Sequence, residues 1–309
     1  MENNIKNKST MDIVIKTMPI ILVRIGANIL KWIIVALVFG IIFGIGLLLT
    51  MASHGNFNAT IIDLIAVAAV VGVVYFINHW IMYLIKAGHV SVISYYMVNG
   101  TLPKEGQVEY AKNIVKKNFV TTNVGFGFDN LVRGATNQAL SVLENAEEFL
   151  NFIPGVGVIM GIAKLFVKTV TNYVDESVMA YIFIKGDGEN VWKKTADGIV
   201  LYVQNWRTIF KASGKVVALV LVLKTILLIL IIGFLTPVIF SGDGMSGIIL
   251  GLIIAFLVWS IVTSILIEPI TVVIMIKEYT YACYKSEVSY DLYEKMKNCS
   301  NKFNEIISK

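Results

Sequence analysis

The sequence predicts an all-α fold, a polytopic membrane helical bundle with about six membrane-embedded segments and both termini in the cytoplasm. Of its 309 residues, 56% are hydrophobic and only 15% are charged, and the mean hydropathy is +0.74. A soluble domain is nearer half apolar and a quarter charged. This composition excludes a soluble enzyme and a disordered tail, and two cysteines are too few for a disulfide scaffold.

The N-terminal region, residues 1–31, is expected to form a cytoplasmic or interfacial helix. Its first ten residues are polar, and they lack the apolar stretch of a cleavable signal peptide. Farther along, Lys16, Pro19, Arg24 and Lys31 interrupt an apolar run. That pattern is typical of an amphipathic helix at a membrane surface. The transmembrane bundle is then expected over residues 32–276, followed by a cytoplasmic tail over 277–309.

Four stretches are apolar and long enough to cross a bilayer, which takes about 20 residues. The first is Trp32 to Ala52, and the second runs from Ala59 to about His79. Apolar character continues to Val98, so the second helix is either unusually long or broken at Gly88. The C-terminal pair covers Val216 to Phe240 and Gly247 to Ile276, the latter interrupted by Glu268-Pro269.

Two middle segments, Phe119 to Leu143 and Ile153 to Ile184, are more polar. The first carries Asp129, Asn130, Arg133, Asn137 and Gln138, so it needs neighbouring helices on most sides. It is therefore the best candidate for an element that lines a pathway. Both segments are expected either to cross the membrane or to enter and return together.

The distribution of basic residues predicts the orientation. The short loops 53–58, 144–151 and 241–246 contain no Lys or Arg. Residues 1–31, 99–118, 185–215 and 277–309 hold five, four, six and six, together 21 of the 26. Because Lys and Arg accumulate on the cytoplasmic side, the charges predict an even number of crossings with both ends inside.

Several charged residues at membrane depth are candidates for function, since such a residue costs roughly 2.5–3.5 kcal/mol when isolated. Asp129 and Arg133, spaced i and i+4, either neutralise each other or line a pathway. Lys86 and His89 share a helix face and are either structural or a proton-titratable gate. Glu268 precedes a proline that breaks the helix, so it either meets a cation there or bonds to a neighbouring helix.

Glycine and aromatic residues indicate how the helices pack and where the membrane interfaces lie. Gly40, Gly44 and Gly46 permit close helix packing, with homo-oligomer formation as the weaker interpretation; Gly155, Gly157 and Gly161 do the same. Aromatic residues near the expected interfaces indicate an aromatic belt, and some of them are candidates for a cation–π box.

The sequence lacks the motifs of common enzymes and cofactor sites. There is no phosphate-binding GxxxxGK[ST] loop, no HExxH and no GxSxG, and three histidines do not make a zinc site. We therefore expect no enzymatic activity, no cofactor and no metal. The charge of +5 is explained by basic loops at an anionic leaflet, with no nucleic-acid partner.

Several stretches in consistent order resemble the choline transporter-like family of multi-pass carriers, over about Trp80 to Glu278. They are His89–Val92 leading to Tyr95-Tyr96, Thr121–Phe128, Tyr173–Gly186 with Ala180-Tyr181-Ile182, and Thr195–Gly198 followed by Asn205-Trp206. The chain departs from the family in being shorter, and in carrying charge at Asp129 and Arg133 where the family pattern is small and apolar. The resemblance implies movement of choline or a related amine across the membrane.

The sequence is compatible with two alternative functions, one as a transporter and one as a non-transporting structural protein. The first is a multi-pass transporter of a small organic cation in the plasma membrane, with membrane lipids as further partners. The second is a non-transporting membrane scaffold or a subunit of a larger assembly. The residues expected along a substrate pathway are Asp129, Asn130, Arg133, Asn137, Glu268, His89, Tyr95, Tyr96, Phe126 and Tyr181.

Overall fold

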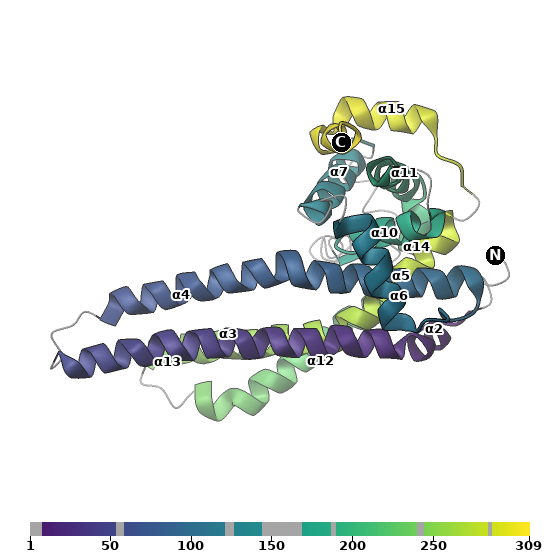
Figure 1. Ribbon diagram of the computed structural model, residues 1–309. Helices are drawn as coiled ribbons and strands as arrows, with labels where there is room; N and C mark the ends of the chain where they lie inside the picture. The colour runs from purple at the N-terminus through teal and green to yellow at the C-terminus, as the bar shows by residue number, and fades with distance from the viewer. Residues whose placement is uncertain are drawn as a thin grey trace, which may run out of the picture.

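The computed structural model describes residues 8–53, 59–120, 127–143, 169–186, 190–239, 244–283 and 286–309, and every regular element in these ranges is a helix (Figure 1). The predicted all-α class is confirmed. The N-terminal half contains α2 (Thr10–Lys16), α3 (Met18–Ala52), α4 (Ala59–Phe76), the π-helix η1 (Ile77–Met82), α5 (Tyr83–Asn99), α6 (Gln107–Val115), the π-helix η2 (Lys116–Val120) and α7 (Phe128–Leu143). The C-terminal half contains α10 (Val174–Lys185), α11 (Val191–Gln204), α12 (Trp206–Ile239), α13 (Gly244–Leu266), α14 (Glu268–Cys283), α15 (Tyr290–Cys299) and α16 (Asn301–Ile307).

Two helical hairpins project in the same direction from a cluster of shorter helices (Figure 1). The first hairpin pairs α3 with α4, and the second pairs α12 with α13. We call the projecting stretches the arms: residues 32–52, 59–76, 217–239 and 244–266. The remaining helices form the body, in which the first and last helices, α2 and α16, both lie (Figure 1).

The helix lengths indicate how the arms meet a membrane. Residues 18–52, 64–99 and 217–237 are long and apolar enough to cross, and the bent pair 251–266 and 268–283 makes a fourth span if counted as one. The described part of the chain thus has three to four candidate spans; the six predicted are not confirmed. The 35 residues of α3 extend about 52 Å, well beyond a hydrocarbon core of about 30 Å. Only the arm part of α3 therefore needs to lie in lipid.

The hydrophobic core lies in the body. Most of its members come from α2, α5, α7, α10, α11, the first turns of α12, α14, α15 and α16. The segment 128–143 belongs to this core: α7 packs against α10, α11 and α16. Its buried side chains recur at helical spacing, which makes α7 an amphipathic helix; they are Phe128, Leu131, Val132, Ala135, Ala139 and Leu140.

Both ends of the chain also fold into the body. Ile13 of α2 and Ile21 of α3 are buried in the core, so the expected interfacial helix faces protein along this side. The C-terminal tail forms α15 and α16, which bury Met296 and Phe303. The side-chain Oε1 of Gln138 in α7 accepts a hydrogen bond of 2.7 Å from Ser300, the N-cap of α16.

Two predicted irregularities have different outcomes. The break at Glu268-Pro269 is confirmed, since α13 and α14 meet there at a bend of 49°, and proline is tolerated in the first turn of a new helix. At Gly88 the helix continues without a break. A Cβ on Gly88 would lie 3.2 Å from the Cβ of Ala111, so the glycine permits close packing of α6. The irregular stretch is η1, six residues earlier in the chain.

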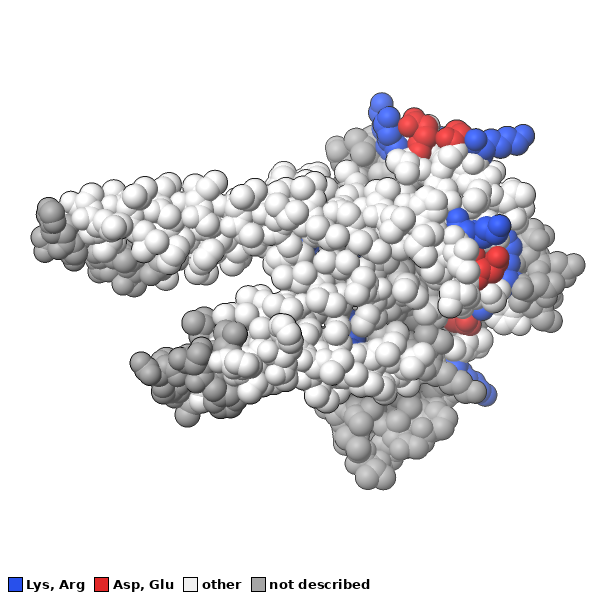
Figure 2. All heavy atoms as spheres, turned by 90° about the horizontal axis from the view of Figure 1, so that it is seen from below, with Lys and Arg blue, Asp and Glu red and all other residues white. Residues whose placement is uncertain are grey.

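Charged residues gather on the body and leave the arms almost bare (Figure 2). Within the four arm stretches the sequence contains only Asp63 and Lys224 as charged residues. Every other Lys, Arg, Asp and Glu of the described ranges belongs to the body or to its junction with the arms. The molecule therefore has one apolar end and one charged end.

Candidate functional site

A layer of buried polar side chains lies where the arms join the body. In α3, Arg24, Asn28 and Lys31 are each less than 10% exposed, and their spacing of four and three residues puts them on one helix face. The Nζ of Lys31 donates a 3.2 Å hydrogen bond to the Oδ1 of Asn78 in η1. This face of α3 therefore carries charge toward the interior and not toward lipid.

His89 of α5 meets the same face of α3. It is fully buried, and its Nδ1 lies 3.2 Å from a terminal guanidinium nitrogen of Arg24. Because arginine only donates, Nδ1 must accept, and the ring proton is assigned to Nε2. Within the described ranges, Nε2 has no hydrogen-bond partner. His89 is thus held in one tautomer by a permanent positive charge.

A second cluster joins α5, α7 and α10 through four charged side chains. Asp175 accepts from the Nε of Arg133 at 3.0 Å through Oδ1, and from the Nζ of Lys86 through Oδ2. The Nζ of Lys86 also lies 3.4 Å from Oε1 of Glu176. Asp175 and Glu176 are both almost completely buried. We call Lys86, Arg133, Asp175 and Glu176 the charge cluster.

The two neighbouring carboxyl groups of this cluster have opposite pKa shifts. Burial by itself would raise the pKa of Asp175, but the nearby charges of Lys86 and Arg133 lower it below its ordinary value. For Glu176, burial and the repulsion of Asp175 raise the pKa to about 7. One oxygen of Glu176, Oε2, has no hydrogen-bond partner in the described part of the chain. Glu176 is therefore the carboxyl group of the cluster whose pKa is raised toward neutral pH.

Tyr173 and Glu268 lie between the two groups. The pKa of Tyr173 is raised by burial and by the negative charges of Glu268 and Glu176. Glu268 is half-buried at the start of α14 and acts electrostatically on Lys31. Its basic neighbour is thus Lys31.

The predicted pathway residues on α7 do not share one environment. Arg133 forms its ion pair with Asp175 on α10, while Asp129, one turn away on α7, is half-buried and adds only a weaker electrostatic effect. Asn130 and Asn137 are exposed. Of the four, only Arg133 enters the charge cluster. Lys86 and His89, which were expected to share a helix face as structural residues or as a gate, also have separate partners, because Lys86 contacts Asp175 and His89 contacts Arg24.

The aromatic candidates are spread over the body. The hydroxyl of Tyr96 donates a 2.8 Å hydrogen bond to Asp12, and the Nζ of Lys8 lies 3.2 Å from its ring centroid. Tyr95 packs edge-on against Tyr110. Tyr181 lies beside Lys185. Tyr96 and Tyr181 thus contact lysines of the chain itself, Tyr95 contacts another tyrosine, and the three rings do not form one aromatic box. Phe126 lies outside the described residues.

The acidic pair Asp175-Glu176 was not among the predicted site residues. Its signal in the sequence is two adjacent acids before an apolar run. In the part of the chain that the structure describes, no group of three or more His, Cys, Asp or Glu side chains could hold a metal ion.

Comparisons with protein-family models, with curated proteins and with solved structures found no match. The resemblance to the choline transporter-like family therefore rests on the sequence stretches given above.

Proposed function

We propose that the chain is an integral membrane protein whose arms anchor a helical body at the cytoplasmic surface, where the body serves as a scaffold or subunit of a larger membrane assembly. The observation that carries this proposal is the separation of apolar arms from a charged body (Figure 2). In this arrangement four arm stretches cross the membrane. The charge cluster stabilises the body just inside the membrane surface.

The basic residues support a cytoplasmic body. The four Lys- and Arg-containing regions identified in the sequence all include body helices, whereas the far ends of both hairpins adjoin loops without Lys or Arg. A helical protein with this charge asymmetry inserts with its basic side in the cytoplasm. Four crossings leave both ends inside, as six would.

The arms favour an anchoring role over transport. A pathway for a cation needs polar groups at several depths, but the arm stretches contain only Asp63 and Lys224 as charged residues. The polar layer and the charge cluster lie at the inner ends of the arms and beyond them. Most of the charge cluster is satisfied by its own ion pairs.

Topology is tested by single cysteines labelled with an impermeant thiol reagent on intact cells. With four crossings, Gly55→Cys and Asp243→Cys react, while Glu147→Cys and the native Cys299 react only after permeabilisation. Labelling of Glu147→Cys on intact cells would instead favour six crossings. Labelling of Cys299 on intact cells would overturn the orientation.

The assembly role is tested by sizing the protein extracted from its native membrane in a mild detergent. We expect a particle larger than one chain with its detergent, and we expect proteoliposomes of the purified chain to accumulate no labelled choline, ethanolamine or betaine. A particle of one chain together with uptake of an amine would overturn the proposal.

Transport of a small organic cation is the second candidate. The observation in its favour is Glu176, a buried carboxyl with an oxygen that has no hydrogen-bond partner in the described ranges. An organic cation or a coupled proton is a chemically suitable occupant. Under this alternative, Glu176→Gln abolishes amine uptake or its pH dependence while Glu109→Gln, on the exposed surface, leaves both unchanged.

A further inference from the structure

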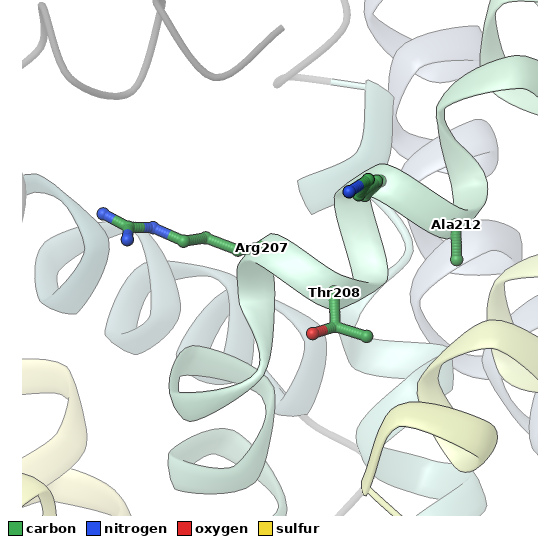
Figure 3. Close-up of a pocket in the computed structure, with 4 residues that line it drawn as sticks. Arg207, Thr208 and Ala212 are labelled. Carbon is green, nitrogen blue, oxygen red and sulfur yellow. The ribbon is translucent and has the colours of Figure 1, made fainter.

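A hollow of about 430 Å³ lies beside the first turns of α12, lined by Arg207, Thr208, Lys211 and Ala212 (Figure 3). It is separate from the charge cluster, which is built on α5, α7 and α10. The lining residues follow the pattern i, i+1, i+4 and i+5, which defines one face of a helix. All four are exposed.

The opposite face of the same turns is fixed to the body. Trp206, Ile209, Phe210 and Ser213 are buried, and Trp206 packs edge-on against Phe210 with ring centroids 5.3 Å apart. The body therefore holds the first turns of α12 in place. The basic face is left pointing outward.

The position of this face along α12 places it at the membrane surface. The apolar span begins at Val217, six residues after Lys211 and ten after Arg207. At 1.5 Å per residue these residues lie about 9 Å and about 15 Å from the start of the span. The headgroup layer covers roughly the first 5–8 Å beyond the hydrocarbon core. Lys211 therefore lies within about one side-chain length of this layer, and Arg207 lies one helical turn farther from the span.

The chemistry of the face suits a phosphate group. A guanidinium binds two phosphate oxygens at once, an ammonium adds a point charge, and the Thr208 hydroxyl can donate a further hydrogen bond. None of the four lining residues that the structure describes is acidic. The guanidinium of Arg207 also lies 5.5 Å from the ring of Trp206, a cation–π contact with a residue that is fixed in the body.

We propose that Arg207, Thr208 and Lys211 form a binding site for the phosphate of an anionic lipid headgroup on the cytoplasmic leaflet. The inference rests on the proposed membrane anchoring, and it adds a specific ligand class and site to it. Bound lipid fixes the angle at which α12 leaves the body. It thereby couples the body to the membrane surface on the side of the second hairpin.

The test uses the full chain purified in a neutral detergent, with thermal unfolding followed as phosphatidic acid, phosphatidylglycerol or phosphatidylcholine is added. We expect the two anionic lipids to raise the Tm and phosphatidylcholine to leave it unchanged. In the Arg207→Gln/Lys211→Gln variant the apparent affinity for the anionic lipids falls roughly tenfold or more, because two charge-assisted contacts are lost.

The matched control is Lys112→Gln/Lys116→Gln, which removes the same charge at the same spacing from the exposed face of α6 and η2. It should bind anionic lipid as the wild type does. Equal loss in both variants would show a response to net charge only, and no loss in the Arg207 and Lys211 variant would exclude the site; either result overturns the proposal.

Inorganic phosphate distinguishes the source of the ligand. Added at the same concentration, it should give a smaller rise in the Tm than the lipids, since it lacks acyl chains. An equal rise would assign the hollow to a soluble phosphate and overturn the lipid proposal. Because the assay is carried out in detergent on the isolated chain, its result is independent of whether the protein assembles with partners in its own membrane.

Discussion

The arms and the body both consist of α-helices, but their apolar side chains lie in opposite environments. In the body, apolar side chains are buried among one another, and charges are paired across helices. In the arms, large apolar residues such as Leu48, Ile229 and Phe234 are more than 60% exposed, a surface that water would not tolerate but lipid would. An apolar residue of this chain therefore belongs to the core only where other helices pack against it, as in the body, and hydrophobicity by itself does not identify the core.

The largest expected effect tests the charge cluster in the body. Asp175→Asn removes the carboxylate that both Lys86 and Arg133 contact, and it leaves the largely buried Lys86 and the half-buried Arg133 without their main partner. We expect a loss of about 3–5 kcal/mol in the free energy of unfolding, measured by denaturant unfolding in detergent. Asp129→Asn, on a half-buried position nearby, should cost little. Equal effects of the two variants would contradict the assigned ion pairs.

A pair of truncations compares the two regions directly. Ile93 is fully buried in the body, so Ile93→Ala should lower the free energy of unfolding by about 2–5 kcal/mol. Leu48→Ala, in the arm, should change it by less than about 0.5 kcal/mol, because that side chain faces lipid in the separated and in the packed helix. A large loss at Leu48 would show that another protein surface covers this face, and it would favour assembly through the first hairpin.

The pH dependence of stability also separates the body from the arms, because the carboxyl groups with strongly shifted pKa values, Asp175 and Glu176, lie in the body. The pKa of Glu176 is raised to about 7 in the folded chain, above its ordinary value near 4.5. The folded state thus binds more protons than the unfolded state between pH 4.5 and 7. Glu176 therefore makes its full contribution to the free energy of unfolding below about pH 4.5. This contribution, up to about 3 kcal/mol, is lost as the pH rises toward 7.

Asp175 acts in the other direction, because its pKa is lowered in the folded chain. Its contribution is present above about pH 4 and is lost in stronger acid. In Glu176→Gln the free energy of unfolding should therefore fall less between pH 5 and 7 than it does in the wild type. The loss of stability in stronger acid, which comes from Asp175, should remain. Unfolding midpoints measured from pH 3 to 8 check this, with Glu109→Gln as the control; an unchanged decline in Glu176→Gln would contradict the assignment.

Local features of the sequence predicted the arms well. Uninterrupted apolar runs place their spans at Trp32 and Ala59 and in the two C-terminal stretches, and a proline after Glu268 predicts the bend between α13 and α14. These signals depend only on neighbouring residues. Hydropathy and backbone chemistry therefore suffice to find them.

The body was harder to predict because it depends on distant contacts. The polarity of residues 119–143 predicts an element that lines a pathway inside a membrane bundle, whereas the apolar residues of α7 recur at the spacing of an amphipathic helix that packs on the body. The partner of Lys86 is 89 positions away in α10. No local pattern specifies such a pairing, so the charge cluster could not be assembled from the sequence.

The smallest expected effect concerns the glycines of the first hairpin, where the arms do make a close contact. A Cβ on Gly46 would lie 2.7 Å from the Cγ2 of Ile62 in α4, while nothing lies within 4 Å of the same position on Gly44. Gly46→Ala should lower stability by about 1 kcal/mol, because the steric conflict outweighs the gain of up to about 1 kcal/mol in helix propensity. Gly44→Ala should be neutral or slightly stabilising. Unfolding in detergent measures both, and cross-linking in membranes provides a second measurement. If Gly44→Ala instead weakens a cross-linked dimer, the open face of α3 contacts another copy of the chain, and the glycines serve assembly as well as the hairpin.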